Sequence, residues 1–307
     1  MINQSLRQLQ NQMESVLRGK SDTIKMAIVT LLGGGHLLIE DIPGVGKTTL
    51  ASVLAKSVEC SFRRIQFTSD LLPTDIIGVT IYNQDRRDFE FRQGPLFSNI
   101  VLADEINRTN PKTQSALLEA MSEKKVSVER NTFVLPEPFM VIATQNPVEY
   151  QGTFPLPESQ LDRFMMHITI GYPLPEYERQ AILRPSSFEI MEDLAPVLSR
   201  QDIVRMQDEA GKIAVHDSLV EYLLQIIAAT RNHPAVRLGA STRGAQFFLT
   251  AARAHAYYEG RDFIIPDDIK MLAPFLLGHR IILKTRRVIA EADLIIRDIV
   301  ERLPVPL

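Results

Sequence analysis

The residues with the clearest chemical potential form a short glycine-containing loop near the start of the chain. The run Leu37 to Ile39 is apolar and suits a buried strand, and apolar residues recur at helical spacing after the loop. The loop itself and the residues that follow it are Pro43, Gly44, Val45, Gly46, Lys47, Thr48 and Thr49. Glycines let backbone N–H groups surround a phosphate, and the positive end of the following helix points at the same place. The pattern therefore predicts a phosphate-binding site.

This loop follows the Walker A pattern, G-x-x-x-x-G-K-[ST], with one departure. Lys47 would reach the β- and γ-phosphates of a nucleoside triphosphate, and the Thr48 hydroxyl would bind Mg²⁺. Asp41 replaces the first glycine, whereas the glycines nearest the phosphates, Gly44 and Gly46, are kept. The alternative interpretation is a chance turn between a core strand and a core helix, so a second motif has to decide.

The second motif is NIVLADEINR, residues 99–108. Ile100 to Ala103 is apolar, as in a strand buried on both faces of a parallel sheet, and it ends in Asp104 and Glu105. Asp104 can hold magnesium, usually through water, and Glu105 can orient and activate the attacking water. Two carboxylates could also merely end a strand. Together with the phosphate loop they favour ATP hydrolysis, with ATP and Mg²⁺ at one sheet edge.

Five apolar segments predict a parallel α/β sheet of the P-loop NTPase type, with strands at 37–40, 64–68, 100–104, 139–145 and 165–170. Asn146 ends the fourth strand; it could hydrogen-bond the γ-phosphate or the attacking water, or simply cap the turn. After Pro173 the pattern is helical, over 177–183, 202–210, 218–230, 243–258, 266–277 and 291–303. We therefore expect an α/β nucleotide-binding core, residues 1–173, and a C-terminal all-α lid domain, residues 174–307.

Smaller elements complete the expected architecture. Residues 2–32 suit two helices that are broken at Gly19. Two hairpins are expected, one with its tip at 83–88 and one with its tip at 129–132. Taken alone, both tips are most simply solvated turns.

Bulk composition is that of an ordinary soluble globular protein. The chain has 307 residues, 45% hydrophobic and 23% charged, with a formal net charge of −3. This charge gives no general attraction to nucleic acid. The single Cys60 rules out an internal disulfide and the start lacks a secretory signal, so we expect a cytoplasmic protein without a membrane span. The scattered histidines suggest no zinc site.

The order and spacing of these motifs resemble the MoxR family of AAA+ ATPases over nearly the whole chain. The resemblance rests on EDIPGVGKTTLA from Glu40, QFTSDLLPTDIIG from Gln66, FRQGPLFSNIVLADEINR from Phe91, KTQSALLEAM from Lys112, ATQNPVEYQGTFPLPESQLDRF from Ala143 and GASTRGAQ from Gly239. The replaced first glycine is its one clear departure, at a position where related members also vary.

The resemblance implies roles for residues outside the two motifs. Asn146 would be the sensor 1 residue, Arg163 the arginine finger offered to a neighbouring subunit, and Arg243 the sensor 2 arginine on the lid. Val16 and Gly19 match the segment that packs against adenine in this family. The alternative for Arg163 is a surface residue paired to Asp162 or Glu158.

The resemblance also implies an assembly and a set of partners. The ring implied by the resemblance is a homo-oligomer, a hexamer. In such a ring the hairpins would face the central pore, which makes Arg86, Arg87, Lys124 and Lys125 candidate contacts to a client. Such a ring would act as a chaperone-like remodeller in the maturation of another protein or the insertion of its cofactor or metal, with a von Willebrand factor A domain protein as adaptor. The alternatives are a nucleic-acid motor, since the hairpins also resemble those of replicative helicases, and a nucleotide-dependent scaffold.

Overall fold

The computed structural model describes residues 4–129, 131–146, 153–183, 187–284 and 289–306. Its centre is a five-stranded sheet in the order β2-β5-β8-β1-β9, in which all neighbours are parallel. The strands are β1 (Leu37–Glu40), β2 (Phe62–Gln66), β5 (Ile100–Asp104), β8 (Met140–Gln145) and β9 (Met166–Ile168). The predicted parallel sheet is confirmed.

The bounds of β2 and β9 differ from the prediction. β2 was predicted over 64–68 but pairs over Phe62–Gln66, since β5 ends at Asp104 opposite Gln66. β9 was predicted over 165–170 but pairs with β1 over Met166–Ile168 only. Equivalent strand ends therefore meet at one edge of the sheet, where the phosphate loop, Glu105 and Asn146 follow β1, β5 and β8.

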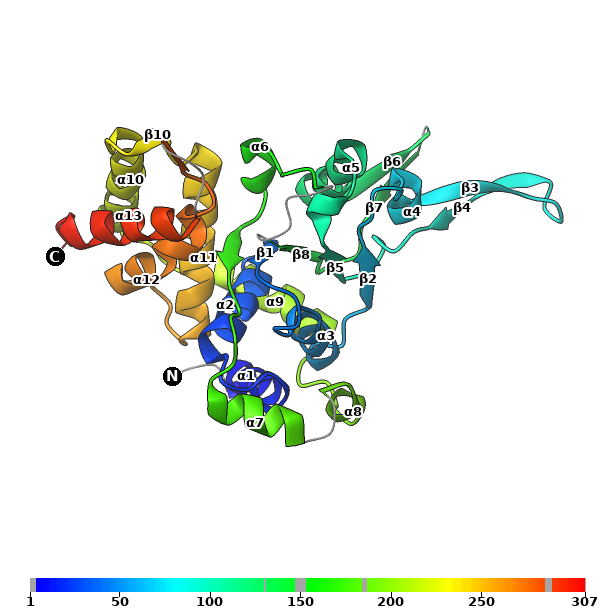
Figure 1. Cartoon of the computed structure of the whole chain (residues 1–307), viewed down its shortest axis with the longest axis horizontal. Helices are drawn as coiled ribbons and strands as arrows, with labels where there is room; N and C mark the ends of the chain where they lie inside the picture. The colour runs from blue at the N-terminus through cyan, green and yellow to red at the C-terminus, as the bar shows by residue number, and fades with distance from the viewer. Residues whose placement is uncertain (1–3, 130, 147–152, 184–186, 285–288, 307) are drawn as a thin grey trace.

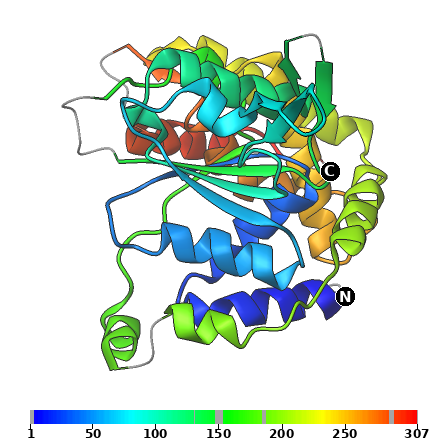
Figure 2. The same cartoon turned by 90° about the vertical axis from the view of Figure 1, so that its right-hand side faces the viewer.

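Successive side chains of a strand point to opposite faces of the sheet, and they belong to two separate apolar layers. Leu37, Ile39 and Leu102 belong to one buried cluster, whereas Leu38 and Val101 belong to the other. The first layer includes α1 (Gln4–Val16), α2 (Ser21–Leu32) and α3 (Lys47–Ser57), and the second includes α5 (Pro111–Glu123). Figure 2 shows the strands between the blue helices α1 and α3 on one side and the blue-green α5 on the other. Both sheet faces are covered, as expected for a parallel sheet.

Both predicted hairpins are present. The antiparallel pairs are β3 (Gly78–Asn83) with β4 (Asp88–Gln93), and β6 (Lys125–Val128) with β7 (Asn131–Val134). The β3–β4 hairpin follows α4 (Pro73–Ile77) and extends away from the body of the molecule (Figure 1). Residue 130, in the predicted tip of the second hairpin, lies outside the described residues.

The C-terminal part is helical as predicted. Its helices are α7 (Pro175–Leu183), α8 (Ser187–Glu192), α9 (Arg200–Gly211), α10 (Asp217–Asn232), α11 (Thr242–Tyr258), α12 (Pro266–Leu277) and α13 (Ile289–Arg302). The short α8 and the two-stranded sheet of β10 (Val236–Leu238) and β11 (Ile282–Leu283) were not predicted. α8 packs against α1 and α3, whereas α10 to α13 pack on one another at the end opposite the β3–β4 hairpin (Figure 1). The domain division after residue 173 stays a prediction.

Candidate active site

The glycine loop takes the conformation that the motif requires. Gly44 has φ +84° and Gly46 has φ +98°, a backbone region that side chains with a Cβ rarely occupy. Gly46 is the residue that precedes α3, so the positive helix end opens directly into the loop. A Cβ on Gly46 would lie 2.8 Å from a methyl carbon of Leu17. The segment after α1 therefore packs close to the loop.

A cavity of about 390 Å³ brings the two motifs together. It is lined by Pro43, Gly44, Gly46, Lys47, Thr48 and Thr49 from the loop and α3, by Arg64 and Gln66 from β2, and by Asp104 and Glu105. Two motifs separated by more than fifty residues in sequence thus share one space. Val45, which was predicted as a nucleotide contact, does not line the cavity, and its side chain is buried in the core.

Asp41, at the position of the missing glycine, makes connections that a glycine could not. One carboxylate oxygen, Oδ2, accepts hydrogen bonds from the backbone N–H groups of Ile170, at 2.7 Å, and Gly171, at 2.6 Å. The other accepts from Ile42 N at 2.8 Å, and Lys47 Nζ donates to the Asp41 carbonyl at 2.7 Å. The departure from the motif therefore ties the start of the loop to the segment that follows β9.

Asp104 is held by two polar neighbours. Thr144 Oγ1 donates to Asp104 Oδ1 at 2.6 Å, and Arg64 donates to Oδ2 through Nη2 at 2.5 Å and Nε at 3.1 Å. Both members of this ion pair line the cavity. Arg64 and Thr144 were not singled out from the sequence, although a threonine in the apolar strand β8 is a polar exception that could have drawn attention.

Glu105 is held in an unusual backbone conformation. Its φ is +57°, in the left-handed region, where strain is often found at functional sites. Gln66 Nε2 donates to Glu105 Oε2 at 2.6 Å, and Arg108 Nε lies 3.1 Å from the same oxygen. Glu105 N donates to Thr144 Oγ1 at 2.9 Å, so one threonine hydroxyl fixes both carboxylate residues. Gln66 is a further site residue that the sequence analysis did not identify.

A divalent cation is compatible with this donor set. The Thr48 hydroxyl and the Asp104 carboxylate line the same cavity and are oxygen ligands, which magnesium prefers. Within the described part of the chain, no cluster of three or more His, Cys, Asp or Glu side chains could hold a metal. Magnesium commonly uses one or two carboxylates together with substrate phosphates, so this small set fits the predicted ion.

Asn146 follows β8 at the same sheet edge, beside β5, and is only 5% exposed. It is not among the residues that line the cavity. The neighbouring residues 147–152 lie outside the described residues.

Of the two predicted adenine contacts, Val16 ends α1 and Gly19 lies next to the start of the helical part. Gly19 has φ +69°, and a Cβ on it would lie 2.4 Å from Cδ2 of Tyr177 in α7. Lys20 Nζ donates to the carbonyls of Ile170, at 2.6 Å, and Tyr172, at 2.8 Å. The structure therefore adds the ring of Tyr177 to the predicted adenine region, which lies beside the phosphate loop through the packing of Leu17 on Gly46.

Arg163 lies in a turn after α6 (Glu158–Leu161); we call residues 162–165 the arginine turn. Its Nη1 donates to the Leu118 carbonyl at 2.7 Å and to Ser122 Oγ, both near the end of α5. Among the described ion pairs, none joins Arg163 to Asp162 or Glu158, so that alternative is not supported. Arg163 is also absent from the lining of the cavity that brings the two motifs together.

Arg243 is exposed in the first turn of α11 and does not line the cavity either. Ser241 caps this helix by accepting a hydrogen bond from Gly244 N at 2.9 Å. The charge of Arg243 acts on a buried arginine, Arg280. The pKa of Arg280 is lowered to about 10, mainly by burial and to a lesser degree by Arg243, while Asp162 opposes the shift.

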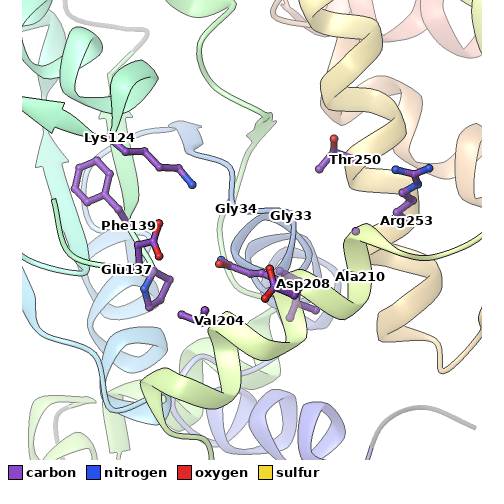
Figure 3. A pocket seen from close by; sticks show the side chains of 14 residues that line it. Gly33, Gly34, Lys124, Glu137, Phe139, Val204, Asp208, Ala210, Thr250 and Arg253 are labelled. Atoms are coloured by element: carbon purple, nitrogen blue, oxygen red, sulfur yellow. The ribbon is translucent and has the colours of Figure 1, made fainter. Parts of the chain in front are cut away.

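The candidate client contacts differ in their surroundings. Arg86 and Arg87 are exposed in the β3–β4 tip, where the exposed rings of Tyr82 and Phe89 pack edge to face with centroids 5.4 Å apart. Lys125 begins the second hairpin, but Lys124 lines another cavity, of about 290 Å³, between the end of α5 and the helices α9 and α11. Figure 3 shows the Lys124 side chain extending along this cavity.

No helix in the described ranges is both long and apolar enough to cross a membrane.

Models of known protein families match both parts of the fold. A family model described as "ATPase family associated with various cellular activities (AAA)" matches residues 36–166, and one described as "AAA lid domain" matches residues 228–301. The chain is 48% identical over 293 residues to YeaC of Bacillus subtilis (strain 168), covering 95% of this chain and 92% of YeaC. It is 43% identical over 281 residues to the protein named Chaperone MoxR1 of Mycobacterium tuberculosis, covering 89% of this chain and 74% of that protein.

A solved structure matches the whole architecture. The crystal structure of a protein from Cytophaga hutchinsonii superposes with a TM-score of 0.87 at 38% sequence identity, covering 99% of this chain and 98% of that chain.

Proposed function

The chain belongs to the MoxR family of AAA+ ATPases, and on that premise we propose that it hydrolyses ATP in a ring of identical subunits to remodel a protein client. One observation carries the proposal. The cavity that joins the phosphate loop to Asp104 and Glu105 contains the groups needed to bind a triphosphate and activate water, but neither Arg163 nor Arg243 of the same chain lines it.

Each residue of the proposed site has a distinct task. Lys47 and the loop N–H groups bind the β- and γ-phosphates, and Asn146 orients the γ-phosphate or the attacking water. Glu105 accepts the proton of that water through its carboxylate, whose Oε2 also accepts a hydrogen bond from Gln66. Magnesium, held by Thr48 and Asp104, would supply positive charge beside the phosphate oxygens. Val16, Gly19 and Tyr177 contact the adenine.

Completion of the site falls to a neighbouring subunit. Negative charge on the γ-phosphoryl oxygens has to be stabilised in the transition state, and an arginine from outside contributes about 10³ to 10⁵ in rate, or roughly 4 to 7 kcal/mol. We assign this task to Arg163 of the adjacent chain. Arg243, which lies outside the cavity lining, is assigned to the nucleotide of its own chain, which it would reach by moving with α11. A closed ring satisfies this head-to-tail arrangement, and six subunits is our working number.

The name of the similar MoxR1 protein supports a chaperone-like role. The exposed β3–β4 tip would contact the client, and a von Willebrand factor A domain protein would deliver it. Maturation of a partner, with insertion of a cofactor or metal, is the task that we assign to the ring, and we expect it in the cytoplasm.

A nucleic-acid motor is the second candidate. The exposed ring pair Tyr82 and Phe89 lies beside Arg86 and Arg87, and exposed rings with nearby arginines also suit stacking on single-stranded bases. The net charge of −3 argues against it. Stimulation of ATPase activity by single-stranded DNA, lost as salt is raised, would favour this candidate over a protein remodeller.

The first experiment measures ATPase activity against protein concentration for wild type, Arg163→Ala and Glu105→Gln, with light scattering on the same samples. Specific activity should rise with assembly, and both variants should bind ATP without turnover. Mixing the two inactive variants should restore part of the activity, since some interfaces then combine an intact Glu105 with an intact Arg163. Activity that is independent of concentration and indifferent to Arg163 would contradict the shared site.

A further inference from the structure

The carboxylate of Asp162, next to Arg163 in sequence, is bonded by two side chains of the helical part. Ser241 Oγ donates to Asp162 Oδ2 at 2.8 Å, and Arg280 Nε donates to Asp162 Oδ1 at 2.9 Å. Ser241 is the cap of α11, and Arg280 follows the end of α12. A single carboxylate of the arginine turn therefore joins two separate elements of the helical part.

Arg280 also holds the backbone of the arginine turn. Its Nη1 donates to the Met165 carbonyl at 3.1 Å, and its Nη2 donates to the Phe164 carbonyl at 2.5 Å. The Arg280 side chain is 1% exposed and lies over the ring of Phe247 at 5.3 Å. Burying an arginine is costly unless its charge and donors are matched, so this guanidinium strongly favours one position of the turn relative to α12.

The same contacts connect the two arginines that we assign to nucleotide. Arg243 is two residues beyond Ser241 on α11, and Arg163 directly follows Asp162. The path from one arginine to the other is thus a helix cap, one hydrogen bond and one peptide unit. If Arg243 moves with α11 when its own site fills, the contacts of Ser241 and Arg280 carry that movement to the arginine turn.

We propose that Asp162 is a positioning residue that transmits the movement of the helical part to Arg163, so that the nucleotide bound in one subunit controls the arginine offered to the next. This inference rests on the proposed function, because it takes Arg163 to act on a neighbouring site. It makes the ring cooperative through a link inside each subunit, with a coupling that is lost when the link is cut.

The test uses mixed rings, so that the effect on the neighbour is measured alone. Glu105→Gln subunits cannot hydrolyse but can donate Arg163, whereas Arg163→Ala subunits can hydrolyse but cannot donate. In their mixture, turnover arises only at interfaces where a Glu105→Gln subunit donates its Arg163 to the site of an Arg163→Ala subunit. Adding Asp162→Asn to the Glu105→Gln subunit should lower this turnover about tenfold, within the usual range of coupling between sites, with KM for ATP unchanged because the hydrolysing subunit is unaltered.

A second substitution guards against misfolding. Ser241→Asp keeps an N-cap side chain but places a second negative charge beside Asp162, and Ser241→Thr keeps both the cap and the hydroxyl. In the Glu105→Gln subunit, Ser241→Asp should lower the turnover of the mixture as Asp162→Asn does. Ser241→Thr should leave the turnover equal to that of the parent mixture. Arg205→Ala, which removes the exposed Arg205–Asp202 pair on α9, is the matched control and should have no effect.

The possible failures are distinct. No recovery in the parent mixture of Glu105→Gln and Arg163→Ala would overturn the shared site itself. Full recovery with Asp162→Asn or Ser241→Asp present would overturn only the link through Asp162. Loss of turnover that parallels loss of ring assembly by light scattering would also overturn it, because Asp162 would then serve only the fold. In homogeneous rings, the same two substitutions should reduce the Hill coefficient for ATP towards one, and a wild-type coefficient of one would contradict the proposal.

Discussion

The nucleotide cavity and the arginine turn are both assigned to the same phosphate chemistry, yet they are built differently. In the cavity, the phosphate loop, Asp104 and Glu105 follow neighbouring parallel strands, so strand pairing alone brings them to one edge. In the arginine turn, Asp162 is held by residues that lie 79 and 118 positions away in sequence. The first site depends on the topology of the sheet, and the second depends on how the helical part is packed against it.

Because the two regions are built differently, substitutions in them should affect different subunits. A substitution in the cavity should act on the chain that carries it, whereas a substitution at the arginine turn should act on its neighbour. Asp41 ties the start of the loop to the segment after β9, and His36 joins β8 to the end of α5, so both should behave as structural links. The following predictions test that division.

Of the substitutions discussed below, Glu105→Gln should have the largest effect. An amide cannot accept the proton of the attacking water, so turnover should fall about 10² to 10⁴-fold. Affinity for ATP should change little, because the loop and Lys47 are untouched. Steady-state ATPase assays and titration with a fluorescent ATP analogue measure the two quantities. Glu119→Gln, on the exposed side of α5, is the control. A comparable loss of affinity in Glu105→Gln would show that Glu105 contributes to binding rather than to the chemical step.

His36 should make stability depend on pH. Val141 N donates to His36 Nδ1 at 3.0 Å, and His36 Nε2 lies 3.0 Å from the Met121 carbonyl at the end of α5. Burial, as the main cause, lowers the pKa of His36 from 6.5 to about 4, so the neutral ring is favoured in the folded chain. The unfolded chain takes up the proton first as pH falls. Folding stability contributed by His36 should therefore be present above pH 6.5 and lost between 6.5 and 4, by about 3 kcal/mol.

Urea unfolding between pH 7 and pH 4 measures this loss. His36→Gln should remove that part of the pH dependence, while the carboxylates contribute equally to both curves. His216→Asn alters an exposed histidine but keeps a side chain suited to its N-cap position, and it is the variant with which His36→Gln is compared. Identical curves for wild type and His36→Gln would contradict the assignment.

The sequence predicted the sheet, both hairpins and most helices because their apolar periodicities are strong. It also predicted that the loop, Asp104 and Glu105 lie at one edge of the sheet, because open α/β sheets bind ligands at the carboxyl ends of their strands. It missed Arg64, Gln66 and Thr144, because a polar residue in a strand gives no sign of which carboxylate it will meet. Asp162 and Arg280 were missed for another reason. Their pairing depends on how α12 packs on β9, and no local pattern contains that information.

Asp41→Gly should weaken the fold more than it weakens nucleotide binding. The glycine restores the Walker A consensus but removes the acceptor of three backbone N–H groups, two of which follow β9. We expect a loss of about 2 kcal/mol in the free energy of unfolding. Asp41→Asn, which keeps one acceptor oxygen, should lose less. Urea unfolding and ATP titration separate the two effects, and a large loss of affinity with unchanged stability would place Asp41 among the phosphate contacts.

Ser122→Ala should have the smallest effect and the opposite sign. Arg163 is bonded to Ser122 Oγ and the Leu118 carbonyl of its own chain, and these contacts have to break before it can reach a neighbouring phosphate. Removing the hydroxyl eliminates one competing hydrogen bond, of about 0.5 to 1 kcal/mol, so turnover should rise about two- to fivefold. Ser127→Ala, in the adjacent hairpin, is the matched control. Turnover that falls in Ser122→Ala would mean that the contact with α5 holds Arg163 in its active position, and the arginine turn would then be preset as firmly as the nucleotide cavity.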